Sequence, residues 1–136
     1  MRRVVITGLG TINPLGNNVE TSWNSLINSK SGITKINKFE VGNYPCKIAG
    51  SIDDSEINHE IVSLREQRKI DRFITLGLIA ANEAITDSGF ILDDESSFRS
   101  GVMVGSGIGG LDTIYKNSSI LDNQGIRKIS PFFIPS

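Results

Sequence analysis

Residues 101–111 read GVMVGSGIGGL, an apolar run that leads through a glycine-rich turn into a helical pattern. The run at 101–104 predicts a strand. The helix that should follow carries apolar side chains on one side, at Leu111, Ile114, Tyr115 and Leu121. Within the turn, Ile108 is the one large apolar side chain. Because glycines allow close backbone approach, the turn either aims Ile108 into a cavity or places it in an ordinary core.

The same alternation of strand and helix extends toward the N-terminus. Residues 3–8 read RVVITG, a β-branched run closed by glycine that is typical of a strand buried on both faces in a parallel sheet. Residues 47–52 predict a second, short strand. Between these segments, Asn17 and Asn18 offer caps for a helix. That helix should end before Gly32 and carry, on one side, Trp23, Leu26 and Ile27.

The strongest helix is expected between Ser63 and Gly89. Ser63 and Glu66 form a capping-box pattern at its start. Its apolar positions recur with the period of one helix face: Ile70, Phe73, Ile74, Gly77, Leu78, Ala81 and Ile85. The opposite side is also apolar, so we expect the middle of this helix to be buried all round. Strands that alternate with helices predict an α/β layered fold.

The composition is that of an ordinary folded chain and sets limits on its partners. The 136 residues fit one domain, and 38% apolar with 21% charged residues argue against disorder. A net charge of −1 gives no bulk attraction to nucleic acid or to a membrane surface. One cysteine suits a reducing cytoplasm, and we find no signal peptide and no apolar run near the ~20 residues of a membrane span. We therefore expect a cytoplasmic protein without membrane insertion.

Two glycine motifs suggest nucleotide binding. Residues 5–8 (VITG) resemble the start of a short-chain dehydrogenase, but Ile12 and Pro14 stand where further glycines are needed. Gly105, Gly107 and Gly110 match the G-x-G-x-x-G pattern between strand and helix. A ribose-binding acid should then follow about 20 residues later, and none stands around residues 128–130. Leu111 and Asp112 also exclude a Walker loop.

Cys46 and His59 are the sole cysteine and the sole histidine. Neither has metal-ligand spacing around it, so we expect a packed cysteine, a surface histidine and no metal site. A single histidine also excludes any site in this chain that needs one cysteine and two histidines.

Five blocks together resemble a known enzyme family. They are RRVVITGLGTINPLGN at the start, SGI at 31–33, EQRKIDRFI at 66–74, GSGIGGL at 105–111 and RKISPFFIPS at 127–136. In this order they resemble the N-terminal third of a β-ketoacyl-acyl carrier protein synthase, closest to the type II enzymes of bacterial fatty-acid elongation. The resemblance implies that residues 1–136 are the N-terminal portion of a thiolase-like α-β-α-β-α fold, incomplete in this chain.

The same resemblance implies an activity that this chain cannot perform alone. The family's reaction is a decarboxylating Claisen condensation on an enzyme cysteine, and the enzymes are homodimers. The nucleophile and both histidines of the family match positions beyond residue 136, so we expect no catalytic residue here, no cofactor, and a truncation before the catalytic cysteine.

Supporting positions can be carried over from the family by motif. Ile108 matches a residue that lines the acyl-chain pocket. Phe133 and Ile134 match a segment that reaches the dimer interface and contributes to the partner's acyl pocket. Two basic clusters match the surface that docks acidic acyl carrier protein: Arg65, Arg68 and Lys69, and Arg127 with Lys128. The alternative for the basic residues is a solvated helix face with Glu66 and Asp71 as neighbours.

Two other functions stay open at this point. One is a non-catalytic subunit of the same superfamily that binds carrier protein or sets chain length. The other is a nucleotide-binding α/β oxidoreductase.

Overall fold

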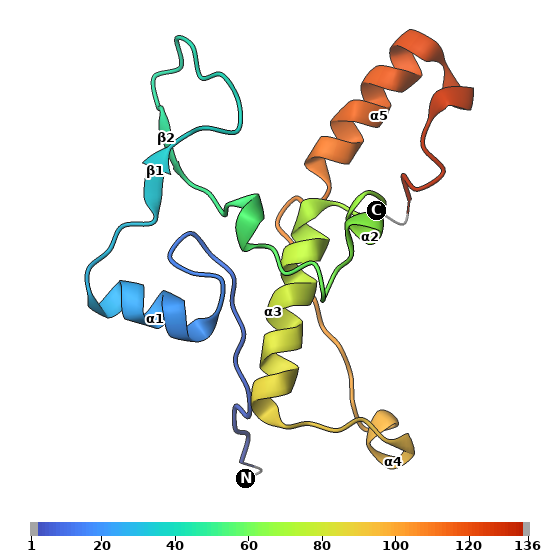
Figure 1. Cartoon of the computed structure of the whole chain (residues 1–136). Helices are drawn as coiled ribbons and strands as arrows, with labels where there is room; N and C mark the ends of the chain where they lie inside the picture. The colour runs from blue at the N-terminus through green and yellow to red at the C-terminus, as the bar shows by residue number, and fades with distance from the viewer. Residues whose placement is uncertain (1–2, 135–136) are drawn as a thin grey trace.

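The structure, a computed structural model, describes residues 3–134. Figure 1 shows the long helix α3 (Arg72–Ser88) in the middle of the molecule, with α1 (Val19–Ile27) on one side and α5 (Leu111–Gln124) on the other. The remaining elements are β1 (Ile33–Lys35), β2 (Ile48–Gly50), the 3-10 turns η1 (Asp54–Glu56) and η2 (Ile126–Lys128), α2 (Leu64–Gln67) and α4 (Asp94–Ser97). The described chain is thus a mixed helix and small-sheet structure, consistent with part of an α/β fold.

The helix starts follow the local caps. The side chain of Asn18 accepts the backbone N–H of Thr21 and begins α1, as expected. Ser63 and Glu66 make both bonds of the capping box at α2. However, α2 ends at Gln67, and Asp71 begins α3, so the single helix expected from Ser63 is two helices.

The helix ends are set by residues in the left-handed conformation. Gly89, with φ of 63°, ends α3 as expected. At the end of α1 this role falls to Ser29, with φ of 55°, and not to Gly32. An exposed polar residue can adopt this conformation at a modest cost. The helix still ends before Gly32, as expected.

The only sheet of the described residues is an antiparallel pair. Ile33 pairs with Gly50, Thr34 with Ala49 and Lys35 with Ile48. Strand β2 confirms the middle of the strand expected at 47–52, but its pairing with β1 was not predicted. The strands expected at 3–8 and 101–104 are wrong for the described chain, where neither segment belongs to a strand. A strand needs a neighbour to receive its hydrogen bonds, and residues 3–134 supply none to these two runs.

Few apolar side chains are buried. The buried apolar residues of the described chain are Ile57, Val62 and Ile79, whereas Val4 is 91% and Met103 is 99% exposed. The expectation that the middle of α3 is buried all round is also wrong, because Leu78 is 47% exposed. No helix within the described residues is long and apolar enough to cross a membrane.

Candidate functional site

A cleft of about 390 Å³ lies where the α2–α3 junction meets α5 and the segment after it. Its walls come from three parts of the chain. Figure 1 shows the backbone of these parts: the junction between α2 and α3, helix α5, and the segment that follows α5 and returns toward α2. The lining residues are Gln67, Arg68, Lys69, Ile70, Asp71, Asp112, Thr113, Lys116, Asn117, Ile120, Lys128, Ser130 and Phe132.

Basic side chains converge on this cleft. Arg68 and Lys69 come from the α2–α3 junction and Lys128 from the end of η2. The ammonium of Lys69 lies 5.5 Å from the ring centroid of Phe132, a cation–π contact. Three of the five basic residues predicted to dock a partner therefore line one cleft.

The other two predicted docking residues lie on nearby elements. Arg65 belongs to α2 and Arg127 to η2, and both are exposed. A fourth basic residue of the cleft, Lys116, was missed by the sequence analysis. Its charge is offset by an ion pair with Asp112, one turn earlier on α5.

A polar network inside the cleft connects α5 to its neighbours. The hydroxyl of Thr113 donates to Asp71 Oδ1 at 2.6 Å. Asp71 is 9% exposed, and its Oδ2 has no hydrogen-bond partner among the described residues. The side chain of Asn117, also buried, accepts the backbone N–H of Ser130 at 3.1 Å. The network fixes α5 against the start of α3 and against residues 128–132.

Thr113 and Asn117 were also not predicted from the sequence, although a signal was present. The two residues are four apart on α5, so they share one face of the helix. Polar residues on such a face are buried when they receive partners from outside the helix, and those partners cannot be read from local sequence.

The capping box holds the carboxylate of Glu66, which follows the predicted docking residue Arg65 in α2. Glu66 accepts the hydroxyl of Ser63 at 2.6 Å and its backbone N–H at 3.0 Å. These bonds, the hydroxyl bond foremost, hold the pKa of Glu66 below its usual value, with a small contribution from the charge of Lys69.

The residues predicted to form an acyl pocket are exposed or half-buried in the described chain. Ile108 is 74% exposed in the turn before α5, and Ile134 is 86% exposed. Phe133 is half-buried. Their role as pocket residues stays a prediction.

Cys46 and His59 occupy loops. Cys46 is exposed, so the expectation of a packed cysteine is wrong: it lies just before β2, where its Sγ donates to the carbonyl oxygen of Ile48 at 3.3 Å. His59 is exposed as expected, and its Nδ1 lies 2.9 Å from Nε2 of Gln67. Within residues 3–134, no three His, Cys, Asp or Glu side chains are grouped so that they could hold a metal.

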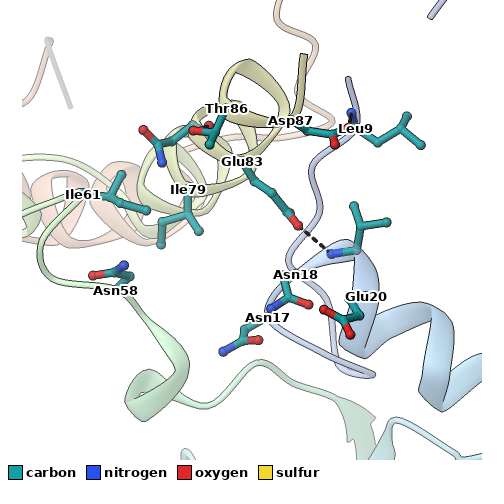
Figure 2. A pocket seen from close by; sticks show the side chains of 12 residues that line it. Leu9, Asn17, Asn18, Glu20, Asn58, Ile61, Ile79, Glu83, Thr86 and Asp87 are labelled. Atoms are coloured by element: carbon teal, nitrogen blue, oxygen red, sulfur yellow. Dashed lines mark hydrogen bonds between the residues drawn. The ribbon is translucent and has the colours of Figure 1, made fainter. Parts of the chain in front are cut away.

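A second cavity, of about 620 Å³, lies between α3, the start of α1 and the N-terminal segment (Figure 2). Its acidic residues have structural partners. Glu83 accepts the backbone N–H groups of Thr11 and Val19, each at 2.8 Å, and Asp87 accepts that of Leu9 at 2.9 Å. These carboxylates hold the N-terminal segment along α3, so the basic cleft is the stronger candidate for a functional site.

Comparison with known proteins identifies the class to which this arrangement belongs. The chain is a member of the β-ketoacyl synthase family, because the family model for the β-ketoacyl synthase N-terminal domain matches residues 1–136. The predicted membership is confirmed, and with it the α/β, thiolase-like fold class.

Within this family, the chain is similar to several proteins that share one name. The chain is 45% identical over 135 residues to the 3-oxoacyl-[acyl-carrier-protein] synthase 2 of Vibrio harveyi, covering 99% of this chain and 32% of the relative. The proteins of the same name from Vibrio cholerae and Coxiella burnetii are 42% and 43% identical, with 99% and 98% of this chain and 32% of each relative covered. The chain thus spans about a third of the length of these curated relatives. None of these names favours the oxidoreductase alternative.

Proposed function

We propose that the complete protein containing this chain is a condensing enzyme of fatty-acid elongation, and that residues 1–136 are the N-terminal portion of its synthase domain, ahead of the catalytic cysteine. The observation that carries the proposal is the match over the whole chain to the family and to relatives named 3-oxoacyl-[acyl-carrier-protein] synthase 2.

The reaction would proceed in two transfers. An acyl chain passes from its carrier thiol to the enzyme cysteine, forming a thioester. Malonyl-carrier protein then loses carbon dioxide, and the electron pair left on its α carbon attacks the acyl carbonyl. The cysteine departs as thiolate, and β-ketoacyl-carrier protein is released. Backbone donors and histidines elsewhere in the protein would stabilise the negative oxygen that develops.

The part of this work assigned to residues 1–136 is docking of acyl carrier protein. Arg68, Lys69 and Lys128 line one cleft, and Arg65 and Arg127 lie on the adjoining helical turns. The chain as a whole has a net charge of −1, so this positive region is local. A local positive region on a near-neutral protein attracts an acidic partner and orients it during encounter.

The acyl chain would be received by Ile108, with Phe133 and Ile134 contributing across a homodimer interface. The apolar side chains of Ile108 and Ile134 are 74% and 86% exposed, so both are accessible to a further protein segment or to an acyl chain. We place this homodimer in the cytoplasm.

The test is a reconstituted condensation with the complete protein. Acyl- and malonyl-carrier protein are supplied, and carbon dioxide and β-ketoacyl-carrier protein are both measured. Equal amounts of the two products are expected. A folded protein that forms neither product would contradict the proposal, and one that forms product only when a second synthase chain is added would support the non-catalytic subunit instead.

A further inference from the structure

The basic side chains of the cleft come from two segments that are distant in sequence. Arg68 and Lys69 lie at the α2–α3 junction, whereas Lys128 lies after α5. Exposed charges contribute to docking as a set, so the set acts only if the two segments keep a fixed separation. Something in the fold must therefore hold residues 128–132 beside the α2–α3 junction.

The side chain of Asn117 makes this connection from α5. It is 6% exposed. Its Nδ2 donates to the carbonyl oxygen of Thr113 at 2.9 Å, which fixes the orientation of the amide. Its Oδ1 accepts the backbone N–H of Ser130 at 3.1 Å. A buried polar group with both of its bonds made holds its partners firmly, because losing either bond would leave a desolvated donor or acceptor.

The connection continues from Ser130 to the basic residues. The hydroxyl of Ser130 accepts the backbone N–H of Phe132 at 3.2 Å, which shapes the turn there. The ring of Phe132 lies under the ammonium of Lys69, 5.5 Å from it. Lys128 precedes Ser130 by two residues, so a shift of Ser130 would move Lys128 and Phe132 together.

We propose that Asn117 is a positioning residue for carrier-protein docking: through Ser130 it holds Lys128 and the Phe132 ring in register with Lys69, so that both segments face the partner at once. The inference rests on the proposed function of the cleft. It assigns Asn117 no contact with the reacting atoms.

The same helix offers a matched control. Asn123 donates to the carbonyl oxygen of Ser119 at 2.8 Å, the same bond one turn back that Asn117 makes to Thr113. Asn123 is exposed and makes no bond to residues 128–132 in the described structure. Asn117→Leu and Asn123→Leu therefore change the same chemical group on α5, but only the first releases Ser130.

The experiment compares two substrates in the complete protein at low salt. One is malonyl-carrier protein, and the other is malonyl-N-acetylcysteamine, a small thioester with the same malonyl carboxylate but without the acidic carrier protein. The ratio of the KM for the carrier-bound substrate to the KM for the small one should rise by about three- to tenfold in Asn117→Leu and not in Asn123→Leu. The rise in the KM ratio should shrink as salt is added, because salt screens the docking charges in the unaltered protein and in the Asn117→Leu variant alike.

Three results would overturn the inference. One is a loss of kcat for both substrates with an unchanged KM ratio, which would make Asn117 merely structural. Another is an equal rise in both variants. If Asn117→Leu does not fold, Phe132→Leu decides the question, since it removes the cation–π contact alone: the KM ratio should rise here too, and an unchanged ratio overturns the proposal.

A charge-reversed protein separates this inference from the function on which it rests. If reversal of Arg68, Lys69, Arg127 and Lys128 to Glu raises the KM ratio but Asn117→Leu does not, only the positioning role fails. If the reversal has no effect on the ratio, the docking function of the cleft fails.

Discussion

Gly10 lies so close to α3 that a Cβ at this position would be 1.9 Å from the carbonyl oxygen of Ala80. A Cβ on Gly8 would similarly be 2.2 Å from the carbonyl oxygen of Ala84. These two glycines therefore serve the contact between the N-terminal segment and the helix backbone. The VITG motif, which resembles the start of a dinucleotide-binding enzyme, has a packing explanation in this chain.

Replacing Gly10 with Ala should destabilise the protein. The new methyl group would collide with backbone atoms that cannot move independently, and overpacking of this kind typically costs ~1–3 kcal/mol. Gly77→Ala is the control, since nothing lies within 4 Å of its Cβ position and Ala favours a helix interior by ~1 kcal/mol over Gly. Thermal unfolding of the complete protein should show a lower Tm for Gly10→Ala alone. Equal Tm values would contradict the close contact.

The features that were predicted correctly from sequence are the local ones. Asn18 and the Ser63–Glu66 pair act on backbone groups three residues away, so their sequence spacing is sufficient evidence. Strands are different, because the ladder partner decides them. The apolar run at 102–104 has strand composition but meets no neighbour within residues 3–134.

The candidate site could likewise be predicted from the sequence only in part. The basic residues were predicted from a family motif, but the motif does not say how Arg68 and Lys128 come to line the same cleft. That arrangement depends on Asp71, Thr113 and Asn117, which are ordinary polar residues in sequence. They acquire a role only when α5 is placed against α3.

The capping box should titrate below the ordinary glutamate range. The pKa of Glu66 is lowered in the folded protein by the Ser63 bonds. Its stabilising effect on α2 is therefore fully present above the unfolded value, about 4.3, and is lost as pH falls through the lower folded pKa. The NMR shift of the Ser63 amide proton should follow this titration with a midpoint below about 4.3.

Glu66→Gln provides the control for this titration. Glutamine at this position can still accept from Ser63 but does not titrate. The Ser63 shift should then be flat over the same pH range. A midpoint at or above the ordinary glutamate pKa in the unaltered protein would contradict the assignment.

The isolated 136-residue chain should have no condensing activity. It contains one cysteine and one histidine, Cys46 and His59. They lie in separate loops, where Cys46 bonds to the carbonyl oxygen of Ile48 and His59 contacts Gln67. Incubation with acyl- and malonyl-carrier protein should release no carbon dioxide above the protein-free rate. Release that persists in Cys46→Ala, with full-length enzyme excluded, would mean that the chemistry resides in other residues of this chain.

Ile108→Phe in the complete protein should shorten the longest acyl chain that is accepted. A larger side chain in a pocket overpacks it at a typical cost of ~1–3 kcal/mol, which long chains would meet and short chains would not. Transfer rates from a series of acyl-carrier proteins would measure the cutoff. Equal loss at every chain length would indicate that Ile108 belongs to the core.

Reversing Arg68, Lys69, Arg127 and Lys128 together to Glu should raise the KM for carrier-bound substrate in the complete protein. Each exposed pair contributes only about 0–1 kcal/mol, so the four residues are changed as a set. Complementary charge acts mainly on the association rate and weakens with salt, so the defect should be largest at low ionic strength.

Reaction with a small acyl thioester should be nearly unchanged, because that substrate does not use the docking surface. A parallel loss of both activities would point to misfolding. An unchanged KM at low salt would assign these side chains to a solvated surface and remove carrier-protein docking from this part of the chain.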